Sequence, residues 1–287
     1  MRYGAKLILQ TLLGRDHVMR TFGVFPDDTF VISYPRSGST WMRFLVANLL
    51  HPNETVTFAN LDRLLPSTAQ ASRRLLKNTK RPRVIKSHNY YDHRYRKVLY
   101  VVRDPRDVVL SEYRFHLKNR YIEDGYPMDR FVSRFMAGDL GAYGSWRENV
   151  GSWLATRGGT ANFLLVRYED MVADINREMT KVAVFFGIGE DRERIARAVE
   201  RSSADHMRAL EKKESDKWVV TKGLRKDIPF VGAATAGGWK QKLPPSNVAQ
   251  IESAWGPLMQ WLGYELVSDA APVAGSDSML AALPASR

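Results

Sequence analysis

The stretch TFVISYPRSGSTW, residues 29–41, decides the fold of this chain. Its first residues are mostly β-branched or aromatic and predict a strand, and the helical apolar spacing of residues 41–50 predicts a helix behind it. The turn between them lies where a helix begins, so free backbone N–H groups and the helix dipole favour an anion there. Gly38 lets the backbone approach that anion, while Arg36, Ser39 and Thr40 add charge and hydroxyl groups.

Further apolar runs have the length of buried strands and alternate with helical patterns. The predicted strands are residues 83–86, 97–102 and 162–166, and the predicted helices are residues 105–118, 129–155, 174–186 and 247–262. This alternation is typical of a parallel sheet that helices cover on both faces. We therefore expect a single three-layer α/β domain.

We expect this domain to span residues 1–267, with its core at 25–265 and a flexible tail at 268–287 that is rich in Ala, Ser and Pro. Residues 7–13 predict an amphipathic N-terminal helix rather than a signal peptide, because the apolar run is short and no small-residue cleavage pattern follows. Residues 211–242 are polar and have no clear period, which predicts a long loop.

The composition narrows the classes of function. The chain has 287 residues, a net charge of +12 and no cysteine, which favours anionic partners and excludes disulfides, thiolate nucleophiles and cysteine-held metals. The cationic residues are scattered, and we expect no nucleic-acid partner. No run approaches the ~18 to 20 apolar residues of a membrane span, so we expect a soluble, cytoplasmic protein.

The turn also resembles the phosphate loop of nucleotide kinases, G-x-x-x-x-G-K-[ST], but two positions differ. Ser33 stands at the first glycine and Ser39 at the lysine. A kinase needs a carboxylate that holds magnesium near the end of a neighbouring strand, and Asp104 keeps that alternative open.

Residues 34–41 resemble the Y-P-K-S-G-T-T-W loop of the cytosolic sulfotransferase family, with Arg36 in place of the lysine. Further motifs resemble those of the family in the same order, so that the likeness covers roughly residues 28–263. They are residues 86–88 for K-T-H, 103–111 for R-N-x-x-D-V…S, 143–146 for Y-G-S-W, 168–171 for Y-E-D-M and 185–187 for F-x-G.

The resemblance implies that the chain uses 3′-phosphoadenosine 5′-phosphosulfate (PAPS) as sulfuryl donor, needs no metal, and has an acceptor that bears a hydroxyl group. In the family, the matching residues bind the donor. They are Arg36, Ser37, Gly38, Ser39 and Thr40 for the 5′-phosphosulfate, Trp41 and Tyr168 for the adenine, Arg103 and Ser111 for the 3′-phosphate, and Ser202 in the T-S-F motif.

The resemblance also implies the catalytic residues. His88, with an ordinary pKa of about 6.5, suits a general base for the acceptor hydroxyl. Lys86 precedes it by two residues, so that on a strand both side chains point the same way toward the sulfuryl group. Arg36 stabilises the leaving oxygen by charge, since arginine does not give up a proton.

The sequence departs from the family before Trp239. The family's F-x-R-K-G-x-x-G-D-W-K aligns with residues 230–240, where Gly232 and Ala233 replace the basic pair that contacts the 3′-phosphate. We expect residues 211–239 to be mobile, to close over the nucleotide, and to supply the cations that replace this pair. The candidate cations are Lys222, Arg225 and Lys226.

Other features leave alternatives open. The T-S-F aromatic is Ala204 here, and the dimerisation motif of the family is not recognisable in residues 244–252, so the oligomeric state stays undetermined. A non-catalytic nucleotide-binding module is the second hypothesis, and a kinase the third. The acceptor, which is a small molecule, a glycan or a lipid, contacts variable loops expected at residues 63–80, 119–130 and 211–235; the loop arginine favours sugar hydroxyls.

Overall fold

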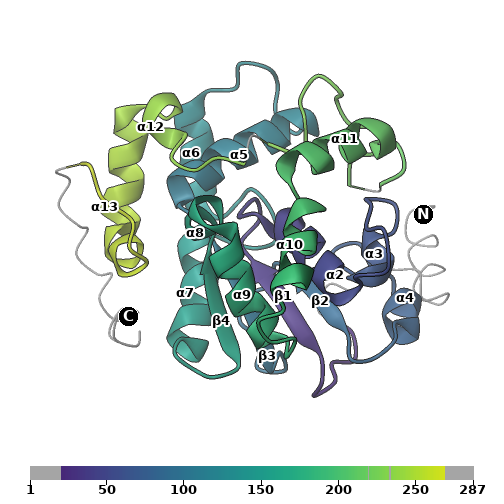
Figure 1. The fold of residues 1–287 in the computed structure, drawn as a ribbon. Helices are drawn as coiled ribbons and strands as arrows, with labels where there is room; N and C mark the ends of the chain where they lie inside the picture. The colour runs from purple at the N-terminus through teal and green to yellow at the C-terminus, as the bar shows by residue number, and fades with distance from the viewer. Residues whose placement is uncertain (1–20, 219, 233, 269–287) are drawn as a thin grey trace, which may run out of the picture.

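The computed structural model describes residues 21–218, 220–232 and 234–268 (Figure 1). Its centre is a sheet of four parallel strands in the order β2-β1-β3-β4. The strands are β1 (Thr29–Ser33), β2 (Val84–Ser87), β3 (Lys97–Val102) and β4 (Phe163–Arg167). Each lies within one residue of a predicted run, and the parallel sheet is confirmed.

Side chains of β1 alternate between two separate cores, because successive residues of a strand point to opposite faces. Phe30 and Ile32 lie in one core and Val31 in the other. The first core is covered by α5 (Pro105–Lys118), α6 (Met128–Ala137), α7 (Trp146–Arg157) and α13 (Pro245–Trp261). The second is covered by α2 (Ser39–Leu50), α8 (Tyr168–Ala173), α9 (Ile175–Phe185) and α10 (Arg192–Glu200). The three-layer prediction is confirmed.

The helix predicted at residues 129–155 is in fact two helices, α6 and α7. Gly138, at φ 77°, ends α6, a left-handed position that favours glycine. Ser145 and Glu148 then form a capping box that begins α7. The break was readable in the sequence, because Ser-x-x-Glu before an apolar run is the usual signature of that box.

The loop predicted at residues 211–242 is partly helical and carries buried side chains. α11 (Ala204–Glu214) extends into it and α12 (Trp239–Lys242) ends it. Between them Trp218 and Phe230 are buried in a third apolar cluster. The carboxylate of Glu211 accepts a hydrogen bond from the backbone N–H of Phe230 at 2.6 Å. The remaining helices are α3 (Leu61–Leu64) and α4 (Arg73–Asn78).

The helix predicted at residues 7–13 lies outside the described residues, as does the predicted tail after Ser268. Of the helices that the structure describes, none is long and apolar enough to cross a membrane.

Candidate active site

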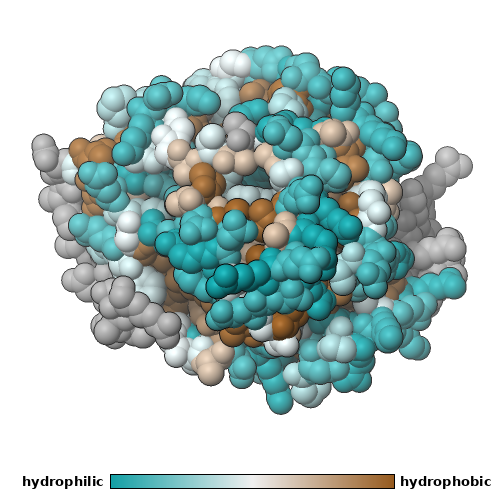
Figure 2. All heavy atoms as spheres, viewed as in Figure 1, coloured by the Kyte–Doolittle hydropathy of each residue, from teal (hydrophilic) through white to brown (hydrophobic). Residues whose placement is uncertain are grey.

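All four strands end at the same edge of the sheet, and residues that follow them line one cavity of about 400 Å³. Figure 2 shows hydrophobic residues gathered around the hollow on this face. The predicted residues in the lining are Arg36, Gly38, Ser39, Thr40, Trp41, Lys86, His88, Arg103, Ser111 and Tyr168. Among the described residues, Ser37 and Ser202 are buried and are not part of this lining.

The turn before α2 is shaped for an anion. Gly38 is the N-cap of α2 at φ 96°, and a β-carbon there would come 2.7 Å from the ring of Tyr168. No side chain caps α2, so its first backbone N–H groups have no side-chain acceptor. The buried hydroxyl of Ser37 likewise has no hydrogen-bond partner within the described residues. The unpaired N–H groups at the start of α2 fit the phosphosulfate end of a donor nucleotide.

Arg36 is held in one position before any ligand binds. Its Nε donates to the Ser111 hydroxyl at 3.2 Å, and its guanidinium lies between the rings of Phe115 and Phe230, at 5.0 and 4.8 Å from their centres. Burial lowers the pKa of Arg36, but a guanidinium stays charged at neutral pH. Arg36 is therefore a fixed cation in the cavity.

The ring of His88 has a defined tautomer. Its Nδ1 lies 2.6 Å from the backbone carbonyl oxygen of Ser33, and since a carbonyl only accepts, Nδ1 must donate. Neutral His88 therefore leaves Nε2 as a hydrogen-bond acceptor. Burial, and next the charge of Lys86, hold the pKa of His88 well below its ordinary value, so the ring is neutral near pH 7. A T-shaped contact with Tyr143, at 5.3 Å, supports the ring.

Lys86 lies at the end of β2 with only 6% of its surface exposed. Burial lowers its pKa well below the ordinary value, and the charge of Arg43 lowers it further. Arg43 was not predicted from the sequence; it forms an ion pair with Asp62 at 2.7 Å and lines the same cavity. An anionic ligand would relieve this repulsion and favour charged Lys86.

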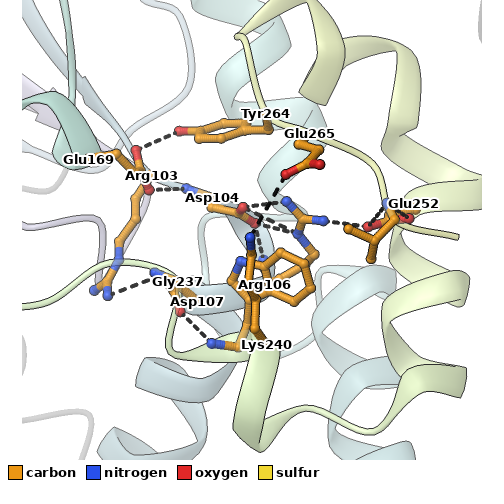
Figure 3. Close-up of polar contacts among 12 residues, drawn as sticks. Arg103, Asp104, Arg106, Asp107, Glu169, Gly237, Lys240, Glu252, Tyr264 and Glu265 are labelled. Carbon is orange, nitrogen blue, oxygen red and sulfur yellow. Dashed lines mark hydrogen bonds and ion pairs between the residues drawn. The ribbon is translucent and has the colours of Figure 1, made fainter.

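The segment around Arg103 is anchored by a buried network (Figure 3). The carboxylate of Asp104 caps α5 by accepting from the backbone N–H of Arg106. Arg106 also forms an ion pair with Asp104 at 2.6 Å and another with Glu252. Asp104 is thus engaged by a buried guanidinium, which argues against its holding magnesium in a kinase. Within the described residues, no group of three or more His, Cys, Asp or Glu side chains is placed to hold a metal ion.

Arg103 itself extends into the cavity. Its guanidinium stacks on the ring of Tyr168 at 4.2 Å and donates to the carbonyl of Thr235 at 3.2 Å. Its Nε is buried and has no partner among the described residues. Arg103 therefore has a cationic donor available to a second anionic group of the ligand, and Ser111 lines the same cavity.

Ser202 acts through Trp41 rather than by lining the cavity. Its carbonyl accepts from Trp41 Nε1 at 3.0 Å, and its hydroxyl contacts the buried amide of Asn48 at 3.1 Å. Ala204 lines the cavity instead. Donor binding by Ser202 stays a prediction, and what the structure shows is that its carbonyl holds the Trp41 indole.

Glu112 is a lining residue that the sequence analysis missed. It is buried, and burial raises its pKa to about 7, against the opposing effect of the Arg36 charge. Its carboxylate lies 3.7 Å from Nε2 of His116. No sequence signal distinguishes Glu112 from the exposed acids of other helices, because burial depends on how α5 packs.

The cations expected to replace the missing basic pair lie elsewhere. Arg225 pairs with Asp227 at 2.6 Å and also with Asp124, and Lys226 pairs with Asp216 at 3.1 Å. In the part of the chain that the structure describes, neither they nor Lys222 line the cavity. Lys118 of α5 also holds the segment that contains these residues, because its Nζ donates to the carbonyls of Arg225 and Ile228.

Comparisons with known proteins agree with this geometry. Residues 26–263 match the model of the sulfotransferase domain. The chain is 29% identical to 3-beta-hydroxysteroid sulfotransferase of Cavia porcellus over 243 residues, which cover 80% of this chain and 82% of that protein. It is 25% identical to sulfotransferase 1B1 of Mus musculus over 286 residues, or 94% of each chain. Both relatives align with most of the chain.

Solved structures share the fold. The structure of mouse sulfotransferase SULT7A1 complexed with PAP (adenosine 3′,5′-bisphosphate) superposes with a TM-score of 0.67 at 22% identity, over 88% of this chain and 89% of that one. Retinol dehydratase in complex with androsterone and inactive cofactor PAP gives a TM-score of 0.67 at 18% identity, over 88% and 85% of the two chains. The family predicted from the motifs is confirmed: the chain belongs to the sulfotransferase family.

Proposed function

We propose that this enzyme transfers the sulfuryl group of PAPS to an acceptor hydroxyl by in-line displacement, with His88 as general base. The observation that carries the proposal is the contact between His88 Nδ1 and the Ser33 carbonyl, because it leaves Nε2 free to accept a proton in the cavity. A base must be unprotonated before the reaction, and burial keeps His88 in that state near neutral pH.

The cavity suits the two anionic ends of PAPS. The turn at Gly38 offers N–H and hydroxyl groups for the phosphosulfate, while Arg103 and Ser111 face the same cavity for the 3′-phosphate. Two solved structures with this fold hold PAP, the product that PAPS leaves after transfer. PAPS would supply the activated sulfuryl group and the leaving phosphate.

The transfer forms one bond to sulfur and breaks another, and Lys86 and Arg36 each assist it in a different way. The acceptor oxygen attacks sulfur, its proton passes to Nε2 of His88, and the bond between sulfur and the bridging phosphate oxygen breaks to give a sulfate ester and PAP. Lys86, at the end of β2, would hold the sulfuryl oxygens, and the fixed guanidinium of Arg36 would stabilise negative charge on the leaving oxygen. The surrounding fold contributes mainly positioning and electrostatic stabilisation.

The acceptor side of the cavity favours a hydroxyl on an apolar body. Phe115, Trp218, Val220 and Phe230 all line it, and the Phe230 and Trp218 rings lie 5.1 Å apart. Such walls suit an aromatic or alicyclic alcohol better than a bare sugar. One relative is named for 3-beta-hydroxysteroids, which are alicyclic alcohols of this kind. The cytoplasmic location stays a prediction.

The test is transfer from radiolabelled PAPS to a panel of phenols, steroid alcohols and sugars. We expect transfer to the apolar hydroxyls, and loss of transfer with retained PAP binding in His88→Ala. A His88→Ala enzyme that transfers at the original rate would remove His88 from the mechanism. Tight PAP binding by the unmodified protein without transfer to any acceptor would instead support the non-catalytic binding module.

A further inference from the structure

Most cations that line the cavity are already engaged. Arg43 pairs with Asp62, Lys118 donates to backbone carbonyls, and Arg36 is sandwiched between aromatic rings. Arg103 stacks on Tyr168 and donates to the carbonyl of Thr235, and Lys86 is buried. A ligand with a further phosphate group would have to find its positive charge among the remaining cations of the lining.

Arg114 and Lys242 are those cations. Both line the cavity and both are exposed, and within the described residues neither makes a hydrogen bond or an ion pair. Each side chain can therefore turn to a ligand without breaking an existing contact.

Arg114 lies one helical turn beyond Ser111 on α5. Residues at that spacing share a helix face, with β-carbons about 5 to 6 Å apart. The charge of Arg114 also acts on Arg36. Burial lowers the pKa of Arg36, and the charges of Arg103 and Arg114 lower it further. Ser111 and Arg114 thus lie on one face of α5, and Arg103, two residues before α5, lines the same cavity as both of them.

Lys242 reaches the cavity from α12, and α12 is docked firmly on the first turn of α5. The carboxylate of Asp107 accepts from the backbone N–H of Gly237 at 2.8 Å and from that of Trp239 at 3.0 Å. The Trp239 ring also packs under the guanidinium of Arg106, 3.6 Å from its centre. Asp107 also pairs with Arg103 at 3.7 Å, so one carboxylate holds both Arg103 and the start of α12, and Lys242 at the end of α12 lines the cavity.

We propose that Arg114 and Lys242 join Arg103 and Ser111 in binding the 3′-phosphate of the nucleotide, in place of the basic pair that Gly232 and Ala233 replace. This inference rests on the proposed function, because it takes a nucleotide with a 3′-phosphate as the ligand. It also relocates the substitute cations from residues 222–226 to α5 and α12, where the structure places unpaired charge beside the site.

The experiment compares two nucleotides by calorimetry: PAP, and adenosine 5′-phosphate, which lacks the 3′ group. The variants are Arg114→Ala, Lys242→Ala and the double variant, with Lys240→Ala as matched control. Lys240 is a cation of the same helix that pairs with Glu265 at 3.8 Å and does not line the cavity. The substituted side chains are exposed, so thermal unfolding should be unchanged and would report any folding defect.

We expect each single substitution to weaken PAP about ten-fold, the size of one charge-assisted hydrogen bond, and to leave adenosine 5′-phosphate within about two-fold. Arg114→Lys should recover part of the affinity, and Lys240→Ala should match the unmodified protein. If the unmodified protein prefers PAP and the double variant keeps that preference, the inference is overturned while the proposed function stands. If the unmodified protein shows no preference for PAP, the proposed donor itself is wrong.

Discussion

The ring of Tyr168 lies directly against Gly38, so that the first residue of α8, which follows β4, contacts the phosphate loop after β1. A β-carbon at Gly38 would come 2.7 Å from Cδ2 of Tyr168, and its φ of 96° is a conformation that L side chains rarely adopt. The loop therefore requires glycine here for both space and backbone conformation.

We predict that Gly38→Ala loses affinity for PAP by about ten-fold or more, because the loop must shift its N–H groups, and loses roughly 1 to 3 kcal/mol of stability from backbone strain. Calorimetry with PAP and urea unfolding measure the two effects. Gly141→Ala is the control, since a β-carbon there meets nothing within 4 Å. Equal PAP affinity in both variants would contradict this function of Gly38.

The pH dependence of kcat/KM should reflect the buried His88. Burial lowers its pKa, so the ring stays a neutral base below pH 6.5, and the acid limb of the profile should lie below that value. Burial also lowers the pKa of Lys86, so the loss of its charge should bring an alkaline limb below pH 10.5.

The profile is measured with PAPS varied and the acceptor saturating. Lys86→Arg, which keeps its charge at every accessible pH, should move the alkaline limb and leave the acid limb in place. An acid limb above pH 6.5 that persists in Lys86→Arg would assign a different base.

Glu112 should make stability depend on pH in a direction opposite to that of most carboxylates. Its pKa is raised from an ordinary 4.5 to about 7 in the folded chain, so between these values the native state binds more protons than the unfolded state. The contribution of Glu112 to stability therefore falls as pH rises through this window. Arg36 opposes the shift, and the nearby His116, with a pKa lowered to about 4, is neutral across the window.

We predict that Glu112→Gln removes this penalty and is more stable than the original protein at pH 8, by roughly 3 kcal/mol at most, with the advantage gone below pH 4.5. Urea unfolding at a series of pH values measures it. The control is Glu193→Gln, an exposed acid on α10. The same gain at every pH would mean that Glu112 is not held in its protonated form.

The fold and the centre of the site were predictable because they depend on local signals. The strand before Gly38 and the alternation along the chain gave the sheet, and the K-S-H motif placed Lys86 and His88 on one strand end. What the sequence did not reveal depends on packing between distant segments. The pKa of Glu112 is raised only because α5 packs with this side chain buried. Arg225 is unavailable to the nucleotide because Asp124, far away in the sequence, already pairs with it.

The polar character of residues 211–239 was also misleading. Average composition suggested a loop with little to order it, but the buried side chains of Trp218 and Phe230 anchor it in the cluster that contains Phe58 and Phe44.

The buried ion pair of Arg106 with Glu252 links α5 to α13. Both side chains are at most 2% exposed, and Glu252 also accepts from the backbone N–H of Ser268 at 2.8 Å. Removing the carboxylate would leave a buried guanidinium with Asp104 alone, and breaking such pairs typically costs about 3 to 5 kcal/mol.

We therefore expect Glu252→Leu to lose on the order of 3 kcal/mol in urea unfolding, whereas Glu265→Gln, at the exposed pair with Lys240, should change stability by less than about 1 kcal/mol. The triple variant Asp104→Asn/Arg106→Met/Glu252→Leu should recover much of the loss, because Asp104 is the other buried partner of Arg106 and the triple variant leaves no unpaired buried charge. That recovery separates the ion pair from mere packing of the side chains. If Glu252→Leu and Glu265→Gln lower stability equally, the network of Arg106 is not what fixes α13 to the first turn of α5, and the position of Arg103 must be set by the stacking on Tyr168 instead.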